Sequence, residues 1–362
     1  MTRVQITGLA VRSAAGEGLA PLHRRTVAGR ALFRPLDRFP RSGPPAAVLD
    51  GDPDLGTALA EVVDQARADA GYPPDAPLFL ALHADRRTAT VVRTVDPAAR
   101  VYTGACVAAS TALIDAASAI AAGRHRQIVV AAGYLVEPRT YALFEAGRAL
   151  ARDGAARPFS RARSGLLLGD ALVAVVLEDA RSATARGARS HARLAGWGRA
   201  GDAHHVCRPD PDGAGLARAA RTALGRAALR PEHLDYVNAN GAGSALSDRS
   251  EAAALHTLFG PPRPGRRRPP RPPIGATKSV HGHALEASAL LELAVTVAAL
   301  HPPDGGDASD RLPATAGWLG LDEDCGIRPL HPDDPAPDRP PRCALTLNAA
   351  FGGANTALVV AV

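Results

Sequence analysis

The sequence has 362 residues, of which 46% are hydrophobic, and its formal net charge is +6 at pH 7. A chain of this size and apolar content can bury a substantial core, and it contains no run of about eighteen apolar residues that would predict a membrane-spanning helix. Aromatic residues make up only 4% of the chain, which argues against the basic, aromatic-rich face of a nucleic-acid-binding protein.

Short apolar runs alternate with Ala-rich amphipathic runs along the chain, which is the pattern of a parallel sheet covered by helices. The sequence therefore predicts the α/β class. In chain order the expected elements are a strand at 4–11, a helix at 56–70, a strand at 78–82, a helix at 107–122, strands at 128–132, 171–177 and 192–197, a helix at 213–224, a strand at 236–239, helices at 248–258 and 285–300, and strands at 344–348 and 357–362.

Segments dense in Pro, Gly and Asp lie at 261–273, 302–310 and 331–342, and we interpret them as surface loops, not as linkers between separate domains. The first contains the basic run Arg266–Arg271. We interpret this run as a solvated loop. The alternative is a docking patch for an acidic protein, in which long-range attraction raises the encounter rate more than the affinity.

The four cysteines lie far apart and form no Cys-x-x-Cys pair, so the sequence predicts neither a metal site nor a disulfide framework. The N-terminus runs directly into an apolar strand from Val4 instead of a signal peptide, which predicts a cytoplasmic protein.

Lys278 is the single lysine of the chain, although Lys and Arg together number 42. Arginine is a planar fork that stays charged, whereas lysine is a compact, rotatable ammonium. The survival of one lysine is either an accident or a sign that a tight polar site needs a small cation. Lys278 lies five residues before His283, which favours the second interpretation.

Four segments carry residues with chemical potential, each with an ordinary structural alternative. Cys106 stands where an extended run meets the first turn of an Ala-rich helix, where the helix terminus favours a thiolate; a buried, inert cysteine is the alternative. Asn240 follows a strand and precedes a small-residue turn, where Asx residues are common. His283 precedes a long helix and is either functional or a loop residue. The segment 348–355 is a glycine-flanked turn that locally predicts a β-hairpin.

Each half of the chain also contains a strand that ends in a polar or thiol residue and passes into a long helix, at Cys106 and at Asn240. This rhythm suggests an internal duplication, although no clear sequence repeat accompanies it.

Taken together, the order and setting of these segments resemble the β-ketoacyl synthases of the thiolase superfamily, and the resemblance covers nearly the whole chain. Further matching segments are Val4–Ala10, Arg157–Ser160, Gly165–Ala171, Asp202–Gly213 and Phe351–Asn355.

The resemblance implies a thiolase fold, in which two duplicated βαβαβαββ halves form five layers in the order αβαβα. The expected N-terminal half, 1–170, carries the nucleophilic cysteine. The expected C-terminal half, 171–362, carries Asn240, His283 and the glycine-rich turn.

The resemblance also implies a catalytic set. Cys106 matches the cysteine that accepts an acyl chain as a thioester from an acyl carrier protein. Two basic residues of the family then assist decarboxylation of a malonyl group, and His283 matches the second of them. Lys278 matches the lysine that supports this histidine, and Glu251 matches an acidic residue of the same network. The amides of Cys106 and Phe351 are expected to form the oxyanion hole.

For substrate binding, the resemblance implies that the Phe351 side chain gates the acyl pocket beside Gly352 and Gly353. Two threonines that hold the pantetheine arm in the family are Ala242 and Ser244 here, so one hydroxyl remains. The family uses no metal or separate cofactor, because its substrates are carried on the phosphopantetheine of the carrier protein.

The chain departs from the family pattern at several positions. Asn240 replaces the first catalytic histidine, and an amide can donate a hydrogen bond but cannot take a proton at neutral pH. Relatives that start chains use Cys, His and Asn, with the His and Asn places exchanged relative to this chain. Glu286 replaces a small residue just after His283, and the stretch 78–106 is much shorter than usual where the family builds part of its acyl pocket and dimer contact.

Three functions remain open from the sequence. The first is a β-ketoacyl synthase-type acyltransferase in polyketide or fatty-acyl biosynthesis, which condenses an acyl group on Cys106 with a malonyl-type extender. The second transfers the acyl group to an amine, alcohol or water without decarboxylation. The third is a non-catalytic partner subunit resembling a chain-length factor, against which the presence of Cys106 counts. Expected partners are an acyl carrier protein and a second subunit, either identical or another ketosynthase-like chain.

Overall fold

A computed structural model of the protein describes residues 3–40, 43–71, 75–260, 271–303 and 312–362. Its strands form two five-stranded halves with the same internal order. The first half runs β4-β3-β5-β6-β1 and comprises β1 (Val4–Ser13), β3 (Leu78–Ala81), β4 (Arg100–Tyr102), β5 (Gln127–Tyr134) and β6 (Ala171–Asp179). The second runs β7-β11-β10-β8-β9 and comprises β7 (Ala192–Gly201), β8 (Tyr236–Asn238), β9 (Ile274–Gly275), β10 (Cys343–Ala350) and β11 (Ala354–Ala361).

In both halves the strands therefore lie, from the free edge inwards, as third, second, fourth, fifth and first in chain order. The halves join where β1 pairs antiparallel with β7, with Val4 opposite Leu194. The two-residue strand β2 (Gly16–Glu17) folds back and pairs antiparallel with the end of β1. The repeated order is the internal duplication that the sequence rhythm suggested.

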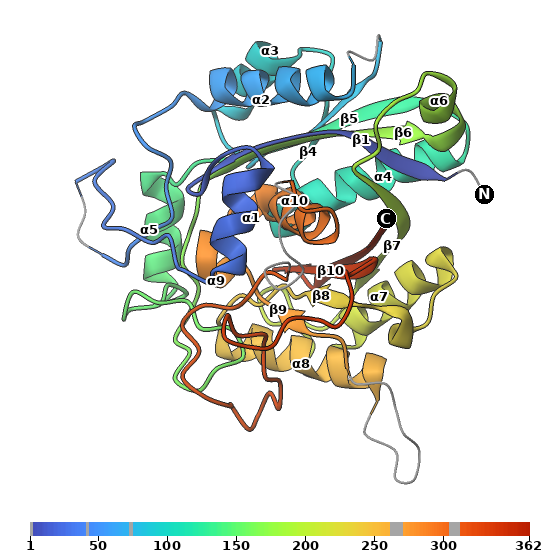
Figure 1. Ribbon diagram of the computed structural model, residues 1–362. Coiled ribbons are helices and arrows are strands. Elements are labelled where there is room, and N and C mark those ends of the chain that lie inside the picture. The colour runs from blue at the N-terminus through green and yellow to red at the C-terminus, as the bar shows by residue number, and fades with distance from the viewer. Residues whose placement is uncertain (1–2, 41–42, 72–74, 261–270, 304–311) are drawn as a thin grey trace.

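Helices fill three layers around the two halves of the sheet, as Figure 1 shows. The outer face of the first half carries α2 (Leu55–Asp69) and α3 (Thr88–Val95). Between the halves lie α4 (Ala108–Ala121) and α10 (Ser288–Leu300), and the outer face of the second half carries α7 (Ala214–Ala227) and α8 (Ala245–Phe259). The αβαβα layering that the resemblance implied is confirmed.

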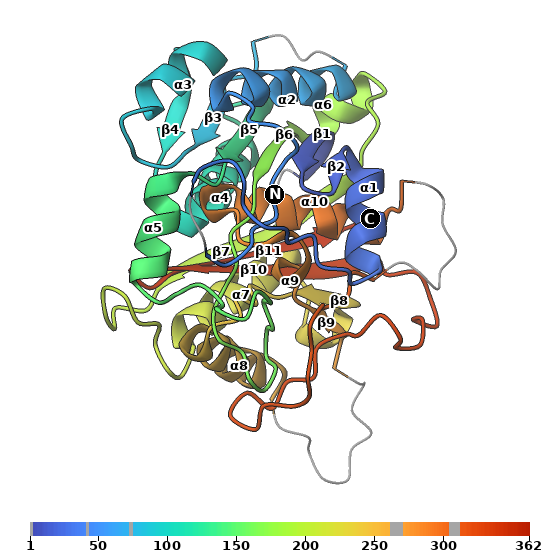
Figure 2. The same ribbon diagram turned by 90° about the vertical axis from the view of Figure 1, so that its left-hand side faces the viewer.

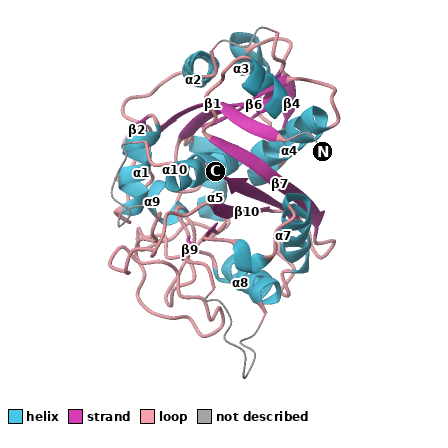
Figure 3. Ribbon diagram, turned by 45° about the vertical axis from the view of Figure 1, so that its right-hand side comes forward, coloured by secondary structure: helices cyan, strands magenta, loops and turns pink. Residues whose placement is uncertain are grey.

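Four further helices lie around these layers in the described residues. Viewed from the side in Figure 2, α1 (Leu19–Val27) and α5 (Pro138–Ala146) flank the layers. Helix α6 (Ala180–Ala185) follows β6, and α9 (Lys278–His281) leads toward α10. Figure 3 shows long loops gathered beside β9 and α8.

The middle layer is apolar because it is covered on all sides. Every residue of α10 is buried, including the charged residue Glu292; a helix that is hydrophobic all round belongs in a core. On the outer layer, α7 lies directly on β7, since a Cβ at Gly198 would stand 2.1 Å from the carbonyl oxygen of Ala219. Glycine at this strand position therefore sets how closely helix and sheet approach.

Most elements predicted from the sequence are present, with ends that differ by a few residues. The predicted hairpin around 348–355 is confirmed, because β10 and β11 pair antiparallel across that turn. Elements that were not predicted from the sequence are α1, α3, α5, α6, α9 and the short strands β2, β4 and β9.

The N-terminal half of the sheet extends further than the expected boundary at residue 170. Strand β6 follows that boundary but pairs with β5 and β1. The two halves, as the sheet defines them, meet between β6 and β7.

The expected loops at 261–273 and 302–310 lie largely outside the described residues, as does the basic run 266–271 apart from Arg271. Within the described ranges, no helix combines the length and apolar character needed to cross a membrane.

Candidate active site

Cys106 lies at a sharp turn between β4 and α4. The preceding residue, Ala105, has a φ of 51°, a left-handed conformation that is costly for a residue with a side chain. A single 3₁₀ turn, η1 (Ala105–Val107), then leads into α4, and Cys106 is 8% exposed. Strained backbone at such a turn is typical of a functional residue that must project from the end of an element.

The thiol of Cys106 is neutral in the resting protein. Burial and, after it, the Glu286 carboxylate together raise its pKa to about 12, while the Lys278 ammonium opposes the shift. The expectation that a helix terminus would favour the thiolate is therefore wrong, because burial, the largest cause, raises the pKa of this thiol.

Asn240 is held in a fixed orientation by groups on three other segments. Its backbone amide and that of Gly241 donate to the two carboxylate oxygens of Glu251 on α8, each at 2.7 Å. Its side-chain oxygen Oδ1 accepts from Lys278 Nζ and from the Ala349 amide, both at 3.2 Å. With Oδ1 occupied in this way, Nδ2 is the side-chain group that remains to donate to a substrate.

Lys278 uses all three hydrogens of its ammonium. Nζ donates to Asn240 O at 2.7 Å, to Asn240 Oδ1 at 3.2 Å and to Glu292 Oε1. The side chain is 2% exposed, and the other oxygen of Glu292 accepts from Asn348 Nδ2. Three acceptors around one point suit an ammonium and not a planar guanidinium, which explains why this position is lysine in a chain otherwise rich in arginine.

Burial also shifts the acidic residues below the Asn240 loop. It raises the pKa of Glu251 to about 8; the Gly241 amide opposes this shift and the charge of Asp248 adds to it. Asp248 accepts from the amides of Phe159 and Gly243, and burial raises its pKa to about 6. Glu251 is thus placed under Asn240 as a support for the loop.

His283 presents a fixed tautomer. Its Nδ1 accepts a hydrogen bond from the Leu285 amide at 3.0 Å and lies 2.9 Å from Ser288 Oγ. Because an acceptor nitrogen carries no proton, the proton of the neutral ring is on Nε2. Burial and the nearby Lys278 lower the pKa of His283 well below its usual value. The ring is therefore a neutral donor through Nε2–H, and not a base, in the resting site.

The structure brings most of the predicted residues around one buried centre. The η1 turn with Cys106 contacts β10, α10 and the 3₁₀ turn η3 (Leu285–Ala287), which follows His283. Lys278 lies close enough to lower the pKa of Cys106 and links this centre to Asn240.

The predicted substrate-binding residues lie further out. Ser244 caps α8, where its hydroxyl accepts from the Ser247 amide at 3.3 Å. Phe351 is 58% exposed in the β10–β11 turn, with its ring centroid 6.4 Å from that of Phe144. Gly352 and Gly353 have φ values of 84° and 71°, a conformation that favours glycine.

Three residues of this network were not predicted from the sequence. Glu292 accepts from Lys278, Asn348 donates to Glu292, and Ser288 lies against His283. Glu292 is one of two charged residues in the largely apolar run 285–300, and that charge was a signal for it. His83, which contacts the buried Glu286 at 2.8 Å, carried no local signal.

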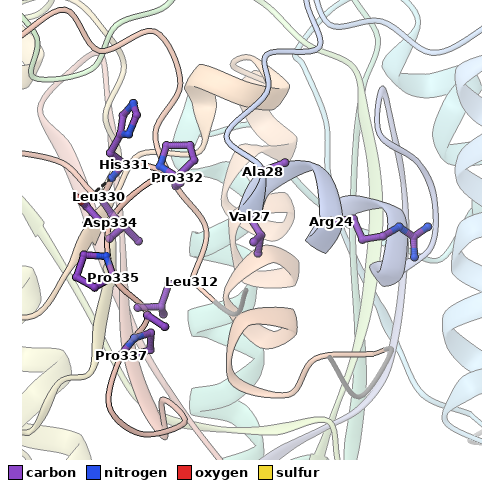
Figure 4. Close-up of a pocket in the computed structure, with 12 residues that line it drawn as sticks. Arg24, Val27, Ala28, Leu312, Leu330, His331, Pro332, Asp334, Pro335 and Pro337 are labelled. Carbon is purple, nitrogen blue, oxygen red and sulfur yellow. Dashed lines mark hydrogen bonds between the residues drawn. The ribbon is translucent and has the colours of Figure 1, made fainter. Parts of the chain in front are cut away.

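A separate surface pocket of about 300 Å³ lies between α1 and the segment 330–337 (Figure 4). Arg24, Leu312 and His331 are among its lining residues, and none of the predicted site residues lines it.

Comparisons with known proteins agree with this architecture. The family described as "Beta-ketoacyl synthase, N-terminal domain" matches residues 97–183, and "Beta-ketoacyl synthase, C-terminal domain" matches residues 191–303. The two matches divide between β6 and β7, as the sheet does.

Among curated proteins, Nodulation protein E of Rhizobium leguminosarum bv. trifolii is 35% identical over 260 residues, which are 71% of this chain and 59% of the relative. The 3-oxoacyl-[acyl-carrier-protein] synthase 2 of Synechocystis sp. is 30% identical over 267 residues, covering 70% of this chain and 59% of the relative. The chain thus spans about three fifths of the length of these relatives. The solved structure of the ishigamide ketosynthase/chain length factor superposes with a TM-score of 0.85 at 25% identity, over 100% of this chain and 99% of that one.

Proposed function

Because the chain belongs to the β-ketoacyl synthase family, we propose that it forms an acyl thioester on Cys106 and condenses it with a malonyl-type extender in polyketide or fatty-acyl biosynthesis. The observation that carries the proposal is the setting of Cys106. Cys106 is a buried thiol on a strained turn that packs against η3, the turn that follows His283. It also lies within electrostatic reach of Lys278, which fixes the carbonyl side of Asn240. An acyl carrier protein would deliver both substrates on its phosphopantetheine, with no further cofactor.

In the first step the sulfur of Cys106 attacks the carbonyl carbon of the incoming thioester. A new C–S bond forms, the C–S bond to the carrier breaks, and the thiol proton ends on the carrier sulfur. The backbone amides of Cys106 and Phe351 are the proposed donors to the carbonyl oxygen while it carries negative charge. Because the pKa of Cys106 is raised, the thiol proton leaves only as the sulfur attacks the thioester.

In the second step the malonyl group loses carbon dioxide when its C–C bond to the carboxylate breaks, and the electron pair forms an enolate. This step removes no proton, so it needs no general base. It needs donors at the thioester oxygen where negative charge collects, and we assign Asn240 Nδ2 and His283 Nε2 to that role. The enolate carbon then attacks the acyl thioester, and the Cys106 sulfur leaves and regains a proton.

In the proposed decarboxylation, Asn240 takes the place of a second histidine as a hydrogen-bond donor. A histidine with a fixed Nε2–H and an asparagine with a fixed Nδ2–H both present a neutral donor. Lys278 positions Asn240 by occupying its Oδ1, and Glu251 positions the backbone beneath it. The set Cys106, Asn240, His283, Lys278 and Glu251 is therefore proposed as the catalytic machinery, in which Lys278 and Glu251 are positioning residues.

The test is intact-protein mass spectrometry after incubation with acyl carrier proteins bearing short acyl groups. We expect a one-acyl adduct that is absent in Cys106→Ala and retained in Cys207→Ala, which removes an exposed thiol. Addition of malonyl carrier protein should then release carbon dioxide and discharge the adduct. An adduct without carbon dioxide release would favour acyl transfer to another nucleophile, and the absence of any Cys106 adduct would favour a non-catalytic partner subunit.

For assembly, we propose a dimer with either a second copy or another ketosynthase-like subunit. The similar solved structure is, in its own description, a ketosynthase/chain length factor. Mass measurement of the purified protein, alone and with co-expressed ketosynthase-like chains, tests this proposal.

A further inference from the structure

Glu286 is a buried acid beside the proposed nucleophile. It lies in η3, three residues after His283, and is 4% exposed. Its Oε1 contacts His83 Nδ1 at 2.8 Å, and the His83 side chain is 38% exposed. His83 follows β3, in the stretch before Cys106 that is short for the family. The imidazole therefore fixes one oxygen of the carboxylate from the outer side of the site.

The second carboxylate oxygen of Glu286 lacks a hydrogen-bond donor. Oε2 is buried and has no hydrogen-bond partner among the described residues. Buried polar atoms in native proteins are nearly always paired, and leaving a charged acceptor without a donor is costly. Such an atom beside a reactive centre is one that a substrate can satisfy.

The packing of two turns places this carboxylate near the Cys106 thiol. The η3 turn, which carries Glu286, packs against the η1 turn, which carries Cys106. In agreement with this packing, the charge of Glu286 is, after burial, the largest influence that raises the pKa of Cys106. The same charge, again after burial, raises the pKa of Tyr134 at the end of β5, so Glu286 is within electrostatic reach of both side chains.

A negative charge at this position is unfavourable for a purely alkyl acyl group. An alkyl chain would lie against a carboxylate oxygen without donating a hydrogen bond to it, whereas an amino or hydroxyl group would give Oε2 its missing donor. Sites built to hydrogen-bond a substrate reject analogues that lack the donor much more strongly than apolar pockets discriminate by size.

We propose that Glu286, positioned by His83, is a specificity-determining residue that accepts a hydrogen bond from an amino or hydroxyl group on the acyl chain held by Cys106. The protein then prefers amino- or hydroxyacyl groups to alkyl groups of the same shape. This inference rests on the proposed acylation of Cys106, and it goes beyond that proposal by naming the substrate class.

The test compares pantetheine thioesters of one shape. The probes are 3-methylbutanoyl, 3-hydroxybutanoyl and 3-aminobutanoyl pantetheine, and the readout is the rate at which the Cys106 adduct forms by intact mass. The wild type should acylate with at least one of the two polar probes about ten-fold or more faster than with the methyl probe, as expected for a hydrogen bond to a charged group. In Glu286→Ala this ratio should fall to about one or invert, and in Glu286→Gln it should fall partway.

Three further variants test whether Glu286 and its contact with His83 set this preference. Glu61→Gln removes an exposed carboxylate on α2 and should keep the wild-type ratio. Tyr134→Phe should also keep it, since a loss of preference there would assign the selection to the phenol and overturn the proposal. His83→Leu should lower the ratio, because the imidazole holds the carboxylate in place.

The outcomes distinguish the inference from the function on which it rests. Acylation by all three probes at similar rates, or a polar preference that survives in Glu286→Ala, overturns the role of Glu286 and leaves the acyltransferase proposal standing. Failure of every probe and of every acyl carrier protein to label Cys106 overturns both. Because the measured quantity is a ratio within one variant, a partial loss of folded protein does not change it.

Discussion

Replacing Lys278 by methionine removes a charge that three acceptors share. The substitution keeps a long, flexible side chain but leaves the Glu292 carboxylate without its cation and Asn240 O without its donor. Both Lys278 and Glu292 are buried, so water cannot replace the lost contacts. Breaking a buried ion pair by removing one partner costs about 3–5 kcal/mol. That is a large part of the 5–15 kcal/mol that typically stabilises a folded domain.

The assay is urea unfolding followed by tryptophan fluorescence, with the free energy of unfolding extrapolated to water. A matched control is Arg230→Met, which breaks an exposed pair with Glu232 and should cost about 1 kcal/mol or less. In a double-mutant cycle, Lys278→Met with Glu292→Gln should cost less than the sum of the single changes, because the second substitution removes the charge that the first leaves unpaired. A loss below about 1 kcal/mol for Lys278→Met, or strictly additive single costs, would refute the pairing as the reason for lysine at this position.

Three further predictions concern separate parts of the structure. Asn240→Ala removes a proposed hydrogen-bond donor to the enolate and should slow carbon dioxide release from malonyl carrier protein by about 10²–10³-fold. The Cys106 adduct should still form. An unchanged rate of carbon dioxide release would remove Asn240 from the catalytic set. The pKa of Glu251 is raised from 4.5 to about 8, so the folded protein binds the carboxyl proton more tightly than the unfolded chain does. The stability that this proton contributes is complete below about pH 4.5 and is lost as the pH rises to 8. The wild type should therefore lose more unfolding free energy between pH 5 and pH 8 than Glu251→Gln does, and parallel pH profiles would contradict this assignment. Gly198→Ala places a Cβ 2.1 Å from the Ala219 carbonyl oxygen and should lower the melting temperature by several degrees. The control Gly225→Ala, where a Cβ meets nothing within 4 Å, should not lower it. Equal melting temperatures of the two variants would show that α7 can shift away from β7.

The layered fold could be predicted because the hydrophobic pattern of each segment agrees with the element that the segment forms in the fold. Apolar runs of strand length and Ala-rich helical runs recur in both halves, and the elements they predict are present at 4–13, 171–179 and 288–300. The segments that were missed are short or mostly exposed. Strand β4 has only three residues and two of them are exposed, so it has no buried period to detect.

The sequence could nominate residues for the candidate site but not their charge states. Lys278 could be singled out by its rarity, and its three acceptors explain that rarity. The protonation of Cys106 was predicted in the wrong direction, since a helix terminus is visible in sequence but the extent of burial is not. The contact between His83 and Glu286 joins positions 203 residues apart, and no spacing rule could have paired them.

The seam between the two halves divides the chemistry as well as the sheet. The Cys106 sulfur lies on η1, just before α4, in the half that ends with β6, whereas the ammonium, the imidazole and the asparagine amide lie in the half that begins with β7. The two copies of one architecture are thus unequal: one supplies the proposed nucleophile, and the other supplies the fixed charges and donors. Neither copy carries the whole candidate site, so the proposed reaction depends on the fit between the two halves.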